Sequence, residues 1–106
     1  MRVIELSARE WKSIGDIYDA LGRAQYEYDG RSTSNVRNVS GLLELLVWDV
    51  WKHENRPYAI RVSGVSHVPA KIRKEITLVQ RLLAEARGES ISRRGVDVKV
   101  QLEILD

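Results

Sequence analysis

Apolar residues at helical spacing in the last third of the chain are followed by a strict two-residue alternation near its end. The helical spacing predicts an amphipathic helix whose apolar stripe is Ile72, Ile76, Val79, Leu83 and Ala86. The alternation predicts a strand buried on one face, formed by Val96, Val98, Val100, Leu102 and Ile104. Alternation of such helices and strands along a chain favours the α/β class of folds.

A first helix is predicted over residues 14–24. Ser13 and Asp16 have the spacing of a capping box, with aspartate in place of the usual glutamate. Gly22 is expected to fray or end this helix because glycine is a poor helix former. The stretch over 25–37 contains Asp-Gly and a Ser/Thr/Asn cluster, which predicts a loop.

Two more helices follow. The second is expected to begin at Asn38, a good N-cap, and to end at about Val50. The third begins at Pro69, since proline is tolerated in the first turn of a helix. Gly88 is its expected C-cap, and the sequence does not decide whether residues 90–93 form a short extra strand.

Strands are predicted over 2–6, 58–63 and 96–104, each rich in β-branched or aliphatic residues. The predicted order is therefore β-α-α-β-α-β. Strands joined by helical crossovers favour a parallel sheet, because parallel neighbours need a long connection. We expect a small three-stranded parallel sheet with helices packed on it, in a single domain over residues 1–106.

Composition and motifs argue against an enzyme. The 106 residues are 43% hydrophobic and 30% charged, include no cysteine, and suit one globular domain. The two histidines, His53 and His67, do not have metal-ligand spacing, and no glycine-rich phosphate loop occurs. We expect no catalytic residue, metal or cofactor. The sequence contains neither a signal peptide nor a membrane-spanning run, which fits the cytoplasm.

Charge is distributed unevenly. Residues 1–50 carry six basic and eight acidic side chains, and residues 71–94 carry seven basic and three acidic ones. One alternative function is therefore binding of nucleic acid through the basic third helix, although Glu75 and Glu85 weaken it. The cations concerned are Lys71, Arg73, Lys74, Arg81, Arg87, Arg93 and Arg94.

The stretch over 12–17 reads Lys-Ser-Ile-Gly-Asp-Ile and leads into the predicted first helix. It resembles the start of the first helix in the barstar family of ribonuclease inhibitors. Tyr-Asp-Gly at 28–30 resembles its aromatic loop, and 38–46, Asn-Val-Ser-Gly-Leu-Leu-Glu-Leu-Leu, resembles its second-helix motif. Residues 84–87 and 96–98 resemble the end of the last helix and the final strand. The resemblance covers nearly the whole chain and has the same element order.

The resemblance implies an immunity protein that plugs the active site of a nuclease. Tyr28 would be the loop aromatic, Glu44 the main acid and Glu85 a peripheral acid. A carboxylate that enters a cationic nuclease site would pair with its arginines and histidine. The full partner-binding set expected on this basis is Tyr28, Asp29, Arg31, Asn38, Ser40, Glu44, Trp48 and Glu85.

Departures from the family pattern indicate a different target. Ser40 stands where the family has an aspartate, Glu44 replaces another aspartate, and the loop over 31–37 is enlarged. A refitted contact surface is how specificity changes. We expect a monomer that binds one cognate bacterial toxin nuclease, most simply a ribonuclease, with no direct contact to nucleic acid or membrane. An interaction domain whose partner is not a toxin is the remaining alternative.

Overall fold

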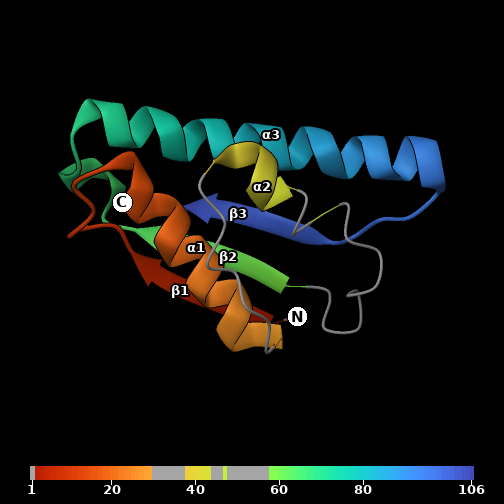
Figure 1. The fold of residues 1–106 in the computed structure, drawn as a ribbon, viewed down its shortest axis with the longest axis horizontal. Helices are drawn as coiled ribbons and strands as arrows, with labels where there is room; N and C mark the ends of the chain where they lie inside the picture. Colours follow the sequence, from red (N-terminus) through yellow and green to blue (C-terminus); the bar gives the residue numbers. More distant parts are fainter. Residues whose placement is uncertain (1, 30–37, 44–46, 48–57) are drawn as a thin grey trace.

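The computed structural model describes residues 2–29, 38–43, 47 and 58–106, and for residues 2, 24–29 and 58 it describes the backbone alone. Three strands and four helices are described, and their order agrees with the predicted β-α-α-β-α-β order except for one added 3₁₀ turn (Figure 1). The elements are β1 Arg2–Ser7, α1 Ile14–Asp29, α2 Val39–Leu43, β2 Tyr58–Ser63, η3 Val65–His67, α3 Ala70–Arg94 and β3 Val100–Ile104.

The strands form a parallel sheet in the order β1-β2-β3, which confirms the predicted fold class. Ile4, Ile60 and Leu102 lie side by side in register, so one face of the sheet is apolar across all three strands. The helices α1, α2 and α3 contact one another and pack on this face (Figure 1). Successive side chains of a strand point to opposite faces, so the other face carries the intervening residues.

One hydrophobic core lies between the apolar face of the sheet and the helices. All five residues of the predicted α3 stripe belong to it. Trp11 is buried as well. The largest fully buried side chains are Tyr18, Ile17, Leu21, Leu42, Ile60, Ile72, Ile76, Leu83, Val47 and Val62.

The second face of the sheet carries a charged row. Glu5, Arg61 and Glu103 lie in register on the three strands. Arg61 Nε lies 2.7 Å from Glu103 Oε2, and both side chains are more than a third exposed. An exposed ion pair of this kind contributes little to stability. The charged row therefore explains why this face of the sheet can remain exposed to water.

The start of α1 confirms the capping box. The backbone N–H groups of Lys12 and Ser13 donate to Asp16 Oδ2 at 2.7 and 3.0 Å, and the Asp16 N–H donates to Ser13 Oγ at 3.3 Å. These hydrogen bonds, first that from Lys12, hold the pKa of the Asp16 carboxyl below its ordinary value. The negative charge of Asp16 also interacts favourably with the positive end of the helix dipole.

Two helices extend beyond their predicted ends. The first prediction, that α1 ends near residue 24, is wrong, because α1 continues to Asp29 and Gly22 is buried inside it. The second, that Gly88 caps α3, is also wrong. The helix continues through residues 90–93 to Arg94, and Gly95 is the C-cap, with a left-handed φ of 66°. Its N–H donates back to Ser90 O and Ile91 O.

The final strand is shorter than predicted. β3 begins at Val100, whereas the alternation predicted a start at Val96. Lys99 has a φ of 55°, in the left-handed region that a β-strand cannot continue through. Val98 is nevertheless buried, as the alternation requires, while Val96 is 38% exposed. The alternating pattern therefore predicted the buried face correctly and the strand start incorrectly.

Candidate partner-binding surface

The residue before α2, Asn38, caps the first turn of the helix, as the sequence predicted. Asn38 Oδ1 accepts a hydrogen bond from the Gly41 N–H at 2.8 Å, and the Leu42 N–H donates to Asn38 O at 3.1 Å. Leu42 is fully buried, whereas Asn38 and Ser40 are exposed. Capping and the buried leucine together hold the exposed side of this turn in one orientation.

Val47 is a second anchor in the segment that follows α2. Its side chain is fully buried in the core, and its carbonyl oxygen accepts a hydrogen bond from Arg94 Nη2 at 3.0 Å. Arg94 is part of the last turn of α3. The C-terminal end of α3 therefore holds the chain between two predicted partner-binding positions, Glu44 and Trp48, which themselves lie outside the described residues.

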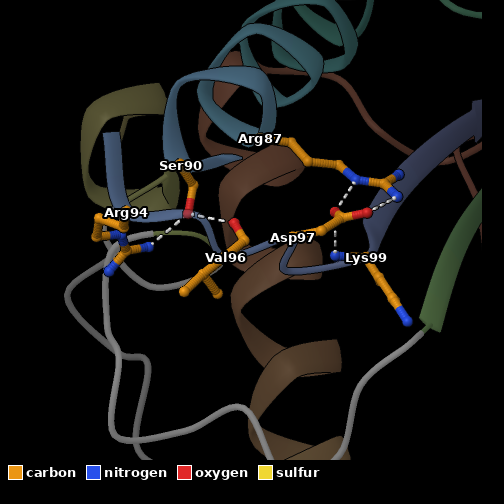
Figure 2. Close-up of polar contacts among 6 residues, drawn as sticks. All are labelled: Arg87, Ser90, Arg94, Val96, Asp97 and Lys99. Carbon is orange, nitrogen blue, oxygen red and sulfur yellow. Dashed lines mark hydrogen bonds and ion pairs between the residues drawn. The ribbon is translucent and has the colours of Figure 1, made fainter. Parts of the chain in front are cut away.

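Ser90 organises the hydrogen bonds around this anchor. It is completely buried, and its Oγ donates to Val96 O and accepts from Arg94 Nη2, both at 2.8 Å (Figure 2). One hydroxyl thus joins the last turn of α3, the chain that leads to β3 and, through Arg94, the Val47 carbonyl. Neither Ser90 nor Arg94 was predicted to have this role, because the predicted helix ended at Gly88.

The turn from α3 to β3 is held by a bidentate ion pair. Arg87 Nε lies 2.5 Å from Asp97 Oδ1, and Arg87 Nη2 lies 2.9 Å from Asp97 Oδ2 (Figure 2). Asp97 Oδ1 also accepts the Lys99 N–H at 3.0 Å. The hydrogen bonds from Arg87 lower the pKa of the Asp97 carboxyl to about 2, with a smaller contribution from the Lys99 N–H. These contacts hold Lys99 where the strand begins.

Replacing Ser90 by alanine is expected to lower the free energy of unfolding by about 1–3 kcal/mol, since it removes the hydroxyl partner of Val96 O and Arg94 Nη2. The measurement is urea unfolding followed by circular dichroism. Ser92→Ala on the same helix is the matched control, because Ser92 is exposed. Equal stability of Ser90→Ala and Ser92→Ala would show that the buried hydroxyl contributes nothing.

The Arg87–Asp97 pair predicts a pH dependence. The native pKa of Asp97, about 2, lies below the ordinary value of 3.8 for an unpaired aspartate carboxyl. Its stabilisation is therefore complete above the unfolded pKa and is lost as the pH falls through about 2. The stability difference between wild type and Asp97→Asn should be largest near pH 6 and should shrink between about pH 4 and 2. Urea unfolding across this range measures it; a difference that does not vary with pH contradicts the assignment.

The structure describes five of the eight predicted partner-binding residues, and two of these five lie in a different element from the one predicted. Tyr28 and Asp29 belong to the last turn of α1, so the prediction that they lie in a loop is wrong. Asn38 and Ser40 are exposed at the start of α2, and Glu85 is exposed on α3, which α2 contacts. Arg31, Glu44 and Trp48 lie outside the described residues, and so does the predicted enlarged loop.

Two of the seven cations of the alternative nucleic-acid site are already engaged in contacts within the protein. Arg87 is paired with Asp97, and Arg94 donates to Ser90 and to the Val47 carbonyl. Both therefore hold the end of α3 in place. The other five side chains are exposed on α3: Lys71, Arg73, Lys74, Arg81 and Arg93.

Other kinds of site were sought in the same part of the chain. Among the described residues, no group of three or more histidine, aspartate or glutamate side chains is arranged to hold a metal ion. No described helix has both the length and the apolar character needed to cross a bilayer. No protein-family model, no curated protein and no solved structure matches this chain.

Proposed function

We propose that this chain is a non-enzymatic immunity protein that binds a bacterial toxin nuclease and blocks its active site. The observation that carries the proposal is the parallel sheet with its β-α-α-β-α-β order, which is the arrangement that the resemblance to the barstar family implies. The proposal therefore rests on the agreement between the fold of this chain and the fold that the resemblance implies.

The way in which the second-helix region is anchored also supports the proposal. Asn38 caps the first turn of α2, Leu42 is buried beneath it, and Arg94 binds the Val47 carbonyl. Binding costs less conformational entropy when the described positions on either side of a contact residue are already held in place. Glu44 lies in sequence between these anchors, which suits the role of a carboxylate that enters a cationic active site.

Complementary charge gives this mechanism a kinetic advantage. Residues 1–50, which contain most of the proposed binding set, have two more acidic than basic side chains. An acidic surface accelerates association with a cationic nuclease site, and the acceleration falls as salt is added. Fast capture matters for an inhibitor that must act before the nuclease cleaves its substrate.

The proposal is tested by affinity capture from a lysate of the source cells with the intact chain as bait. We expect mass spectrometry to identify a retained nuclease, and we expect added chain to stop that enzyme from cleaving labelled RNA or DNA. Retention of RNA alone would favour the alternative use of the basic third helix. Retention of proteins without nuclease activity would favour an interaction domain with another partner, and both results would overturn the immunity function.

A further inference from the structure

A groove lies along the amino-terminal half of α3. Lys71, Lys74, Leu78 and Arg81 recur at spacings of three and four residues and so share one face of the helix. Ile14, the first residue of α1, borders the same groove. The groove has a volume of about 560 Å³, and its lining comprises Ile14, Lys71, Lys74, Glu75, Thr77, Leu78 and Arg81.

Three cations border this groove, and no partner for them lies within the part of the chain that the structure describes. Lys71, Lys74 and Arg81 are exposed, and within the described part of the chain none of them takes part in a hydrogen bond or an ion pair. Glu75 is the one acidic side chain in the lining, and it accepts a hydrogen bond from the buried Tyr18 hydroxyl of α1. The groove therefore has a positive balance, and its carboxylate is already engaged.

The surface between the cations is largely apolar. Ile14 and Leu78 are partly exposed within the groove. A ligand that fits must therefore present apolar and anionic groups together. Single-stranded nucleic acid matches only the cations, because its bases bind chiefly by stacking on aromatic side chains, and the lining contains no aromatic residue.

We propose that this groove is a second docking surface, which binds an acidic amphipathic helical segment of a protein partner. Arg81 lies ten positions after Lys71, which is about 15 Å along a helix. A partner helix of about three turns can place apolar residues at i, i+3 or i+4 and i+7 over Leu78 and Ile14. Acidic residues beside that stripe would meet the lysines and the arginine.

The groove is separate from the surface proposed to block a nuclease. None of the residues in its lining belongs to the predicted partner-binding set, which is concentrated on residues 28–48 and Glu85. The groove lies instead at the end of α3 that is nearest the start of α1 (Figure 1). The two proposals can therefore fail independently, and a chain with both surfaces could bind two partners at once.

The test uses the intact chain and a fluorescein-labelled helical peptide of about four turns, with leucines on one face and glutamates on the other. Binding is measured by fluorescence anisotropy. The double variant Lys74→Glu/Arg81→Glu reverses two groove cations and is expected to weaken binding at least about tenfold. Arg73→Glu/Arg93→Glu changes the net charge equally at exposed α3 positions outside the groove, and a loss below about twofold is expected.

Two further probes separate apolar from purely electrostatic binding. A peptide with serines in place of the leucines should bind at least about tenfold more weakly than the original peptide. Circular dichroism of each variant verifies that the chain is folded, which the exposure of all four replaced residues leads us to expect.

Each of four results would overturn the assignment. Equal losses from both double variants would mean that only net charge attracts the peptide. Equal binding of the serine peptide would mean that the apolar surface has no role. Tighter binding of an oligouridylate, lost in Lys74→Glu/Arg81→Glu, would assign the cations to nucleic acid. A dimer in sedimentation analysis that this same variant dissociates would assign the groove to a second copy of the chain.

Discussion

Leu83→Ala is expected to lower the free energy of unfolding by about 2–5 kcal/mol, which is a large part of the stability of a domain of this size. Leu83 is 1% exposed and belongs to the core between α3 and the sheet. Truncation removes buried apolar surface and also leaves a cavity that rigid neighbouring elements fill only in part. Urea unfolding followed by circular dichroism measures the change.

Ile91→Ala on the same helix is the matched control. Ile91 is 47% exposed, and the substitution removes a side chain of the same volume without opening a cavity in the core. Its expected effect is within about 0.5 kcal/mol. If the two variants unfold at the same urea concentration, Leu83 does not face the core, and the register of the whole apolar stripe of α3 is wrong.

The end of α3 shows where local sequence signals fail. Glycine commonly ends a helix. Gly88 nevertheless lies in the interior of α3, where an added Cβ would have no neighbouring atom within 4 Å. An interior glycine costs about 1 kcal/mol relative to alanine. The turn beyond it adds the contacts of Ser90 and Arg94, so tertiary hydrogen bonds outweigh the local preference. Gly95, with its positive φ, is the residue that ends the helix.

The start of β3 has a related explanation. Alternation of apolar and polar residues predicted a strand from Val96, and it identified Val98, Val100 and Leu102 as buried correctly. The pattern reports which side chains face the core, and it contains no information on whether a neighbouring strand is within hydrogen-bonding reach. Because Lys99 has a left-handed conformation, the strand begins only at Val100.

The candidate surface was predictable only in part. The cap at Asn38 follows from local chemistry, and the structure confirms it. Tyr28 was assigned to a loop because Asp-Gly and the polar cluster after it indicate turns, but α1 continues to Asp29. The Arg94–Val47 contact joins residues 47 positions apart, and no periodicity along the chain encodes such a pairing. Long-range hydrogen bonds of this kind require the fold itself.

Under the proposed immunity function, Glu44→Lys is expected to weaken binding of the nuclease at least about 30-fold while the chain remains folded. Loss of one member of a buried charge pair at an interface costs about 2–5 kcal/mol, and a factor of ten in affinity corresponds to about 1.4 kcal/mol. The lysine adds repulsion, because it would face the cations that the proposed interface pairs with Glu44. Isothermal titration calorimetry with the captured nuclease measures the change.

Glu89→Lys makes the same change of charge at an exposed position of α3 outside the proposed binding set, so it separates a local effect from a global one. Long-range attraction alone would slow association by similar factors in both variants and would fade in high salt. A lost contact would instead accelerate dissociation in Glu44→Lys alone, even at high salt. Equal affinities of wild type and Glu44→Lys would remove Glu44 from the interface, and with it the central carboxylate of the proposed inhibitory mechanism.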